Sequence, residues 1–391
     1  MPTYVFYDTE TDEYFEDVMT YSTKQDLLSK NPHIKPVPAP FGMVSGVGQI
    51  DSKLDDGFKE VLRKALSFSN ITVLTESHGN VQGEGAIDQI DRWIMSLSDD
   101  QKNQLHWDVI ISLGHNVISR KVKSLIKEKV KEHWSLQFQT QPIDTYRKNP
   151  TLIPLEPTVF LNKWLPELPE GMQPNSLHWM NQRHQTLLPD YFSNRPHSDA
   201  RVFYQISQTL PFGAQVQMGN SSAVRYLQLM EQRSDLTYFG NRGVSGIDGC
   251  TSTAVGAALA THDQVILITG DLSFLYDANA LWQQQWPSNL KVIIIDNGGG
   301  GIFRIIEGAK AEPSVPVLFE TPHSRDIHKW IQGWGLNALE YHETTESDFI
   351  HFFNQTESAM MIVKTQAELN PIELDLFFQY FKEYNERMEN H

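Results

Sequence analysis

Three predicted strands in the second half of the chain end in polar or glycine residues, the residue types best suited to hold a ligand. The segments AQVQMG, QVILITG and KVIIID run directly into GNSS, GDLS and DNGGGG. In open parallel sheets, ligands bind outside the carboxyl ends of the strands. We therefore expect a binding site where Asn220, Asp271 and Asn297 follow their strands.

The four consecutive glycines at 298–301 raise the question of what approaches the backbone there, because glycine has no Cβ to keep a neighbour away. A phosphate-binding loop would need Gly-x4-Gly-Lys-Ser/Thr, and no lysine follows these glycines. A dinucleotide fingerprint needs glycine at its sixth position, which is Phe303 counted from Gly298 and Arg304 counted from Gly299. Neither nucleotide pattern fits, which leaves a metal site or a tight turn.

A magnesium site agrees better with the order of the elements. Asp271 and Asn297 follow consecutive strands separated by one helix, so neighbouring strands would bring both side chains to one ion. Carboxylate, amide and backbone carbonyl oxygens are the hard donors that Mg²⁺ prefers. In the alternative interpretation, Asp271 only caps the next helix and DNGGGG is a flexible turn. That alternative suffices for either loop alone, whereas the two loops together favour the metal.

The sequence of elements predicts an α/β fold with parallel sheets and helices on both faces. From about residue 70, strands such as ITVLTE and WDVIISLG alternate with amphipathic helices, and a second unit of this kind begins near residue 200. The preceding segment differs, with strand-like TYVFYD, a short capped helix in STKQDLLSKNPH, proline-rich PHIKPVPAPFG and an amphipathic helix in LDDGFKEVLRKAL. We expect a small N-terminal module at 1–66, a partial Rossmann-like middle domain at 67–175 and a C-terminal domain at 176–391.

The bulk composition excludes several classes of protein. A formal net charge of -16 argues against a nucleic-acid-binding protein, which needs a basic surface. No apolar run reaches the length of a membrane span, and the first residues lack the pattern of a signal peptide. The one cysteine, Cys250, cannot form an internal disulfide, fits a reducing cytoplasm and is expected to pack in the core.

Gly270-Asp271, followed after one strand–helix–strand span by Asn297, resembles the cofactor motif of thiamine diphosphate-dependent enzymes. The resemblance implies that Asp271, Asn297 and the backbone carbonyl of Gly299 hold Mg²⁺ or Mn²⁺ on the cofactor diphosphate. Two positions depart from the usual motif: Leu272 replaces a glycine, and Asp296 replaces an asparagine at a position that does not bind the metal.

Within that group, GDLSFLYDANAL, NGGGGIF, GNSSAVR and NRGVSGIDG resemble the 2-succinyl-5-enolpyruvyl-6-hydroxy-3-cyclohexene-1-carboxylate (SEPHCHC) synthase (MenD) family of menaquinone biosynthesis. The resemblance runs from about residue 70 to the C-terminus. It implies a transferase that joins decarboxylated 2-oxoglutarate to isochorismate. The implied catalytic residues are Asn220, Ser221, Arg225 and Arg242. The implied substrate-binding residues are Arg120, Lys121, Ile302 and Phe303, and the implied cofactor-binding residues are Gly270, Asp271, Leu272, Ser273, Ile247 and Asn297.

One group that the resemblance requires has no match in this sequence. In these enzymes a glutamate from an N-terminal pyrimidine-binding domain activates the cofactor, and that domain faces the diphosphate domain of another subunit. We therefore expect a homodimer or tetramer, a pyrimidine domain supplied by another chain or missing, and little activity from this chain alone. The first part of the middle domain is also expected to be absent.

Residues 1–66 resemble small FmdB-like proteins of tailed phages, but they contain no cysteine pair and so imply no zinc site. Alternatively, FGMVSGVGQ is the first strand of the middle domain. Three functional hypotheses follow: the cofactor-binding portion of a SEPHCHC synthase, a non-catalytic fused or truncated relic, or part of another thiamine-dependent carboligase such as an acetolactate synthase relative.

Overall fold

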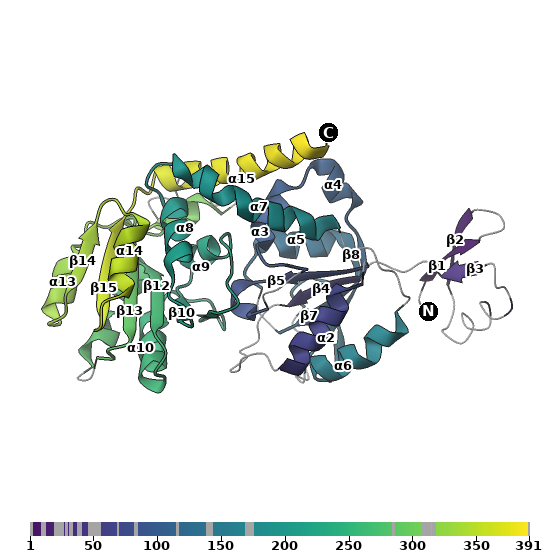
Figure 1. The fold of residues 1–391 in the computed structure, drawn as a ribbon, viewed down its shortest axis with the longest axis horizontal. Coiled ribbons are helices and arrows are strands. Elements are labelled where there is room, and N and C mark those ends of the chain that lie inside the picture. Colours follow the sequence, from purple (N-terminus) through teal and green to yellow (C-terminus); the bar gives the residue numbers. More distant parts are fainter. Residues whose placement is uncertain are drawn as a thin grey trace.

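The computed structural model describes residues 3–8, 13–18, 27, 30, 34–36, 41–45, 56–68, 70–81, 85–114, 117–137, 144–168, 176–283, 286–306, 314 and 318–389. These residues form one three-stranded sheet and two six-stranded sheets (Figure 1). The two larger sheets are parallel throughout, with helices packed around them. This architecture confirms the α/β fold class.

The N-terminal sheet is antiparallel, in the order β2-β1-β3. Its strands are β1 (Thr3–Asp8), β2 (Glu13–Val18) and β3 (Ile34–Pro36). The strand expected at TYVFYD is therefore present as β1. Most of the capped helix expected at STKQDLLSKNPH lies outside the described residues, and the likeness of this segment to phage proteins stays a prediction.

The middle sheet has the order β6-β5-β4-β7-β8-β9. Its strands are β4 (Phe41–Ser45), β5 (Ile71–Thr75), β6 (Ala86–Ile87), β7 (Trp107–Leu113), β8 (Val130–Leu136) and β9 (Thr151–Ile153). Numbered within the sheet, this order is 3-2-1-4-5-6, the doubly wound order of Rossmann folds. The sheet therefore has its first strand, which is β4.

The position of β4 corrects the domain boundary that the change of sequence texture suggested near residue 66. β4 pairs in parallel with both β5 and β7, so it lies at the centre of the middle sheet. The following helix α2 (Asp56–Leu66) buries Phe58, Val61 and Leu62 in the same core as Val73 and Val109. The middle unit thus includes β4 from Phe41 onward, as in the alternative that assigned FGMVSGVGQ to its first strand.

The C-terminal sheet has the order β11-β10-β12-β13-β15-β14. Its strands are β10 (Gln215–Met218), β11 (Thr237–Gly240), β12 (Val265–Gly270), β13 (Leu290–Asp296), β14 (Ala338–Tyr341) and β15 (Ala359–Lys364). Along β13, Ile293 and Ile295 join one apolar core while Val292 and Ile294 join another. The near-continuous apolar strands are therefore explained by burial on both faces.

Helices cover both large sheets (Figure 1). Those of the middle unit, besides α2, are α3 (Ile90–Ser96), α4 (Asp99–Gln104), α5 (Arg120–Lys129), α6 (Pro157–Trp164) and the short η1 (Ser77–Gly79) and η2 (Leu165–Glu167). Those that follow are α7 (Ser176–Ser193), α8 (Asp199–Thr209), α9 (Ser222–Leu227), α10 (Cys250–Ala260), α11 (Asp271–Tyr276), η3 (Ala278–Trp282), η4 (Gly301–Arg304), α13 (Ile327–Gly333), α14 (Glu346–Phe353) and α15 (Leu369–Glu389). Within the described part of the chain, no helix combines the length and apolar character needed to cross a bilayer.

The two large units are joined by buried polar contacts. Figure 1 shows α15 running along both units, and it packs on α3 of the middle unit and on α8. Asn385 donates a hydrogen bond of 3.0 Å to the carbonyl oxygen of Ser96, and its Oδ1 lies 3.0 Å from Nε2 of His184. The fully buried Arg92 donates to the carbonyl oxygen of Leu229 at 3.0 Å. These contacts fix the middle unit against the C-terminal unit.

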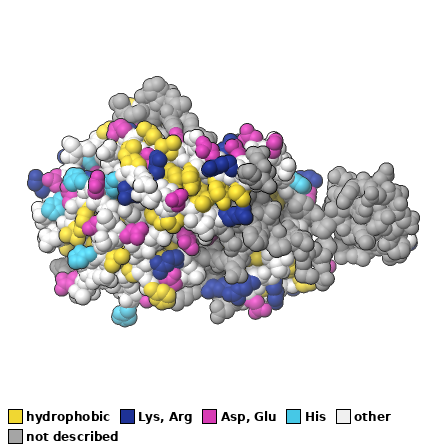
Figure 2. All heavy atoms as spheres, turned by 45° about the horizontal axis from the view of Figure 1, so that its top comes forward, with side chains coloured by type: hydrophobic (Ala, Val, Ile, Leu, Met, Phe, Trp, Pro, Cys, Tyr) yellow, Lys and Arg dark blue, Asp and Glu magenta, His cyan; other side chains and the backbone are white. Residues whose placement is uncertain are grey.

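Figure 2 shows the surface of one face. Acidic and basic side chains are interspersed there with hydrophobic ones, and the basic side chains form no continuous tract over the described atoms of that face. This distribution agrees with the excess of acidic residues in the sequence.

Candidate functional site

The C-terminal sheet has a cavity at the carboxyl ends of its central strands. The chain passes from β10 outward to β11 and then returns to β12 on the other side of β10, so the strand order reverses between β10 and β12. Crevices at such reversals are the usual ligand sites of open α/β sheets. A cavity of about 280 Å³ lies here, and we call it the strand-end cavity. Its lining includes the predicted residues Asn220, Ser221, Ile247, Gly270, Asp271, Leu272, Ser273, Asn297, Gly299, Ile302 and Phe303.

Asp271 links the two predicted metal loops. It is the first residue of α11 and is 2 % exposed. Its Oδ1 accepts a hydrogen bond of 2.6 Å from the N–H of Leu272, and its Oδ2 accepts one of 2.9 Å from the N–H of Gly299. Burial raises the pKa of this carboxyl. Asp271 therefore contacts the backbone of its own helix and that of the glycine run, so the two loops meet as expected.

Asn297 presents an oxygen that lacks a partner. Its Nδ2 donates to Oδ2 of Asp199 at 3.3 Å, and Asp199 in turn accepts a 2.6 Å hydrogen bond from the hydroxyl of Thr365. With the amide held this way, Oδ1 of Asn297 is buried and has no hydrogen-bond partner among the described residues. A buried acceptor without a donor is costly unless a ligand satisfies it. Asp199 was not identified from the sequence, and burial raises its pKa to about 6.

The residues fit a divalent cation. The Asp271 carboxylate, the unpartnered Asn297 Oδ1 and the Gly299 carbonyl all belong to residues that line the strand-end cavity. The Gly299 carbonyl accepts one hydrogen bond, from the N–H of Gly301 at 3.0 Å, which leaves one lone pair available. This set of hard oxygen donors is the type that binds Mg²⁺ beside phosphate oxygens.

The glycine run is approached by protein backbone from one side. Gly299 has a φ of +156°, and a Cβ there would lie 2.7 Å from the carbonyl oxygen of Glu320. The N–H of Gly300 donates to that same oxygen at 2.6 Å, and the N–H of His323 donates to the Gly298 carbonyl at 3.0 Å. Glycine is therefore required at position 299 by the close approach of the Glu320 backbone.

Asn220, after β10, organises a second wall of the cavity. Its Nδ2 donates to the carbonyl oxygens of Asn241 at 2.8 Å and Gly246 at 2.5 Å. Its Oδ1 accepts from Nη1 of Arg242 at 2.5 Å. The loop that carries Arg242 is thus fastened to β10, and burial lowers the pKa of this guanidinium.

Ser221 and Ile247 have backbone features that the sequence does not reveal. Ser221 has a φ of +76°, which is unusual outside glycine and costs about 1–3 kcal/mol, typically at functional sites. The hydroxyl of Ser273 donates to the Ile247 carbonyl at 2.5 Å, which fixes Ile247 in the cavity wall. Cys250 is buried in the core beside Ala254, in agreement with its expected packing role.

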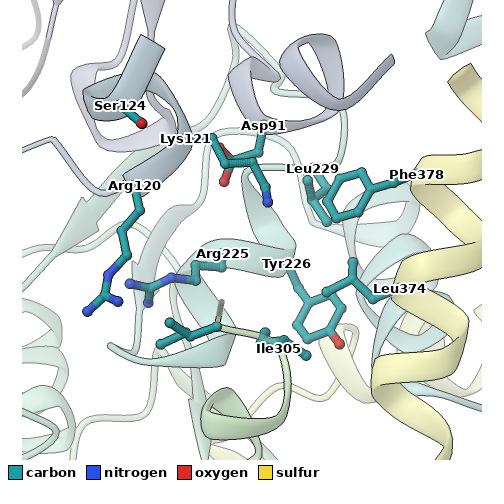
Figure 3. Close-up of a pocket in the computed structure, with 11 residues that line it drawn as sticks. Asp91, Arg120, Lys121, Ser124, Arg225, Tyr226, Leu229, Ile305, Leu374 and Phe378 are labelled. Carbon is teal, nitrogen blue, oxygen red and sulfur yellow. The ribbon is translucent and has the colours of Figure 1, made fainter. Parts of the chain in front are cut away.

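A second cavity, of about 310 Å³, lies between the middle and C-terminal units, and we call it the inter-unit cavity (Figure 3). Its lining is basic on one side and largely apolar on the other, and consists of Asp91, Arg120, Lys121, Ser124, Arg225, Tyr226, Leu229, Ile305, Ile306, Leu374 and Phe378. In Figure 3 the guanidinium groups of Arg120, from α5, and Arg225, from α9, lie near each other. The structure thus brings the predicted pair Arg120 and Lys121 to Arg225.

The electrostatics of the inter-unit cavity favour an anion. Burial, reinforced by the neighbouring positive charge of Arg242, lowers the pKa of Arg225 to about 10. Nη1 of Arg225 donates to the carbonyl oxygen of Ser221 at 2.7 Å, which holds the side chain along α9. Guanidinium groups gathered in this way are suited to bidentate binding of carboxylates.

Glu76 supports this cavity, although the sequence analysis did not single it out. It follows β5 and is fully buried, and it accepts hydrogen bonds of 2.7 Å from the N–H groups of Ile118 and Ser119. These donors immediately precede α5, which carries Arg120. Burial raises the pKa of Glu76 to about 7. The signal that could have identified it is the one used for Asp271, a carboxylate at the end of a buried strand.

Two short elements connect the cavities. Ser221, which immediately precedes α9, lines the strand-end cavity, and Arg225, within α9, lines the inter-unit cavity. After the glycine run, Ile302 lines the first cavity and Ile305 the second. The two cavities are therefore neighbours that share walls.

Comparison with known proteins agrees with this geometry. Residues 217–363 match the family model for the thiamine pyrophosphate enzyme C-terminal TPP-binding domain. The chain is 35% identical over 321 residues to the SEPHCHC synthase of Flavobacterium psychrophilum, which covers 80% of this chain and 57% of that relative. It is 34% identical over 347 residues to the enzyme of the same name from Flavobacterium johnsoniae (87% of this chain, 61% of the relative). The corresponding enzyme of Desulfotalea psychrophila is 34% identical over 295 residues (75% and 53%).

The chain thus spans less than two thirds of the length of these relatives. The family match covers strands β10 to β15 almost completely, including the loops of Asp271 and Asn297. The resemblance to thiamine-dependent enzymes is confirmed. Residues 217–363 are similar to the C-terminal TPP-binding domain of thiamine pyrophosphate enzymes, and a larger part of the chain is similar to SEPHCHC synthases.

Proposed function

We propose that this chain is the cofactor-diphosphate and substrate-binding portion of a SEPHCHC synthase, which joins decarboxylated 2-oxoglutarate to isochorismate. One observation carries the proposal: a cavity with metal and diphosphate donors shares its walls with a cavity lined by Arg120, Lys121 and Arg225. The relatives named above support the choice of this reaction.

In this proposal the strand-end cavity holds thiamine diphosphate with Mg²⁺ or Mn²⁺. Asp271, the Asn297 Oδ1 and the Gly299 carbonyl hold the cation, and Gly270, Leu272 and Ser273 surround the diphosphate. Bound there, thiamine diphosphate supplies the carbon nucleophile and electron sink that decarboxylation of a 2-oxo acid requires. Ile247, fixed by the hydroxyl of Ser273, supports the cofactor between its two rings.

The inter-unit cavity receives the substrate carboxylates. 2-Oxoglutarate and isochorismate each carry two carboxylates, and Arg120, Lys121 and Arg225 offer cationic donors to them. The opposite side of the cavity, with Leu374 and Phe378, is apolar and suits a carbocyclic ring. Arg242, held by Asn220, adds a further carboxylate contact at the boundary with the cofactor. Ile302 and Phe303 close the substrate region from the cofactor side.

Activation of the cofactor requires a pyrimidine-binding domain outside these residues. Tyr276 and Phe319 line the strand-end cavity and yet are 65% and 55% exposed. Such an apolar rim suits burial against that domain, contributed by another chain in a cytoplasmic homodimer or tetramer. Its activating glutamate has no counterpart that we identified in the sequence.

The test has two stages. First, calorimetric titration of the full chain should give thiamine diphosphate binding only when Mg²⁺ or Mn²⁺ is present. Second, the N-terminal pyrimidine-binding domain of the Flavobacterium psychrophilum enzyme is added, and consumption of isochorismate is followed with 2-oxoglutarate. We expect isochorismate to be consumed only in the mixture.

Other outcomes distinguish the alternatives. Turnover by the chain alone would refute the requirement for an external glutamate. Turnover of pyruvate in preference to 2-oxoglutarate would favour an acetolactate synthase relative. Absence of cofactor binding in the first stage would favour a non-catalytic relic.

A further inference from the structure

The segment Glu320–His323 packs directly on the glycine run and resembles a strap across it. The Gly300 N–H donates to the Glu320 carbonyl at 2.6 Å, and the His323 N–H donates to the Gly298 carbonyl at 3.0 Å. A Cβ on Gly299 would lie 2.7 Å from the Glu320 oxygen, so there is no spare room between the two segments. The strap therefore determines where the Gly299 carbonyl lies.

The strap is anchored at its first residue. The Glu320 side chain is 5% exposed and forms a bidentate ion pair with Arg304, at 2.9 Å from both Nε and Nη2. Arg304 is the last residue of η4, which follows the glycine run. A buried, bidentate carboxylate–guanidinium pair is geometrically specific. Both ends of the glycine run are thus tied to the strap.

At the other end of the strap, His323 faces the metal loop. Its Nε2 lies at an ion-pair distance of 3.3 Å from Oδ2 of Asp271, and it is buried without a hydrogen bond to any described residue. Its Nδ1 accepts a hydrogen bond of 3.2 Å from the N–H of Arg325. Because Nδ1 accepts, the ring proton of the neutral imidazole is on Nε2. This tautomer places the N–H nitrogen of His323 3.3 Å from a carboxylate oxygen of Asp271.

The same tautomer argues against His323 as a metal ligand. Ligand atoms of Asp271, Asp296 and His323 lie within 4.8 Å of one another, a spacing that could hold an ion. A histidine ligand must offer a nitrogen lone pair, and here Nε2 carries the proton. Asp296 is occupied as well, because its Oδ2 accepts from Lys364 at 2.5 Å and its Oδ1 from the Gly298 N–H at 3.3 Å. Of the three residues, only Asp271 is then placed to bind a metal ion, and Asp296 and His323 are its neighbours.

We propose that His323 is a positioning residue that orients the Asp271 carboxylate toward the cation of the cofactor site. The inference rests on the proposed cofactor site. Partners that hold a metal-binding carboxylate from behind typically contribute 10–100-fold to metal affinity. His323 acts together with the strap backbone, which sets the Gly299 carbonyl, so two of the three proposed donors depend on the Glu320–His323 segment.

The test measures Mn²⁺ binding to the full chain by electron paramagnetic resonance, with and without thiamine diphosphate. His323→Ala should weaken Mn²⁺ binding about 10–100-fold. His323→Gln, whose amide nitrogen can occupy the place of Nε2, should recover most of the loss. His342→Ala is the matched control, since His342 lines the same polar hollow of about 710 Å³ as His323 but its side chain is 79% exposed and pairs with Glu340.

The outcomes separate the inference from the proposed function. If the wild-type chain binds no Mn²⁺, the proposed cofactor site fails. If it binds Mn²⁺ and His323→Ala binds equally well, the positioning role fails. Equal loss in His323→Ala and His323→Gln, with unchanged melting temperature of the metal-free protein, would also overturn the positioning role. Equal loss in His342→Ala would attribute the effect to the hollow as a whole and contradict a specific contact with Asp271.

Discussion

The two six-stranded sheets use the carboxyl ends of their strands in different ways. In the C-terminal sheet, Asp271 lines a cavity, accepts from the N–H groups of Leu272 and Gly299 and lies beside His323, while Oδ1 of Asn297 has no partner among the described residues. In the middle sheet, both oxygens of Glu76 are used by the N–H groups of Ile118 and Ser119. The first carboxylate lines the strand-end cavity, and the second holds the start of the helix that carries Arg120 and Lys121. A carboxylate at a strand end can therefore face a cavity or hold a neighbouring helix, and the segments packed around it decide which.

The largest expected effect comes from a substitution at the carboxyl ends of the strands in the C-terminal sheet. Gly299→Ala introduces a Cβ 2.7 Å from the Glu320 carbonyl oxygen at a φ of +156°, so the strap must move. We expect a destabilisation of ~2–4 kcal/mol and loss of most cofactor binding. Calorimetric titration with Mg²⁺ and thiamine diphosphate, together with urea unfolding, checks both.

The matched control is Gly256→Ala in α10, where an added Cβ meets no atom within 4 Å. There alanine should stabilise the helix by about 0.5–1 kcal/mol. Cofactor binding by Gly299→Ala at the wild-type level would mean that the glycine run tolerates a side chain and that the strap does not set its geometry.

Glu76, at the carboxyl end of β5 in the middle sheet, should make the free energy of unfolding depend on pH. The pKa of Glu76 is raised from 4.5 to about 7 by burial, so the folded state retains this proton to higher pH than the unfolded state. Its contribution to stability is therefore lost as pH rises from about 5 to 8. Relative to Glu76→Gln, the wild-type free energy of unfolding should fall by roughly 2 kcal/mol over this range.

Urea unfolding at pH 5, 6, 7 and 8 measures this difference, and comparison with Glu76→Gln cancels the titration of other groups. Glu60→Gln, at an exposed position of α2, controls for removing a carboxylate. A difference that does not change with pH would show that Glu76 is ionised in the folded protein throughout the range.

The smallest expected effect tests whether the two cavities bind different ligands. Arg225→Ala removes a guanidinium that we propose binds a substrate carboxylate in the inter-unit cavity, and it should weaken 2-oxoglutarate binding by about 10-fold. Cofactor binding should change by less than about twofold, because Arg225 does not line the strand-end cavity. Calorimetric titration with each ligand checks this, with Lys127→Ala at an exposed position of α5 as control. Equal loss of both ligands would contradict the division of roles between the cavities.

The two loops proposed to hold the metal could be predicted to meet because this prediction needs only the order of the elements. Strands that run into Asp271 and Asn297 must end at one sheet edge, whatever the packing around them. Asp199 and His323 were missed because each reaches the site from a distant segment, and neither follows a strand. Their roles depend on tertiary contacts, the hydrogen bond from Asn297 and the approach to Asp271, that leave no local pattern.

The boundary of the middle unit was wrong for a similar reason. Phe41–Ser45 is short and follows a proline-rich stretch, so its sequence favours a linker. What makes it a central strand is pairing with β5 and β7, whose positions in the sequence are far apart. Parallel pairing of this kind is specified by the whole sheet rather than by any one segment.

The central place of β4 also limits how this protein can be shortened. A chain beginning where the sequence texture changes, near residue 66, would lack the strand between β5 and β7. Both would then expose rows of unpaired backbone N–H and C=O groups, which are templates for pairing with other molecules. Such a truncated protein should aggregate. A protein that begins ahead of Phe41 keeps β4 paired between β5 and β7, in the unit that carries Arg120 and Lys121.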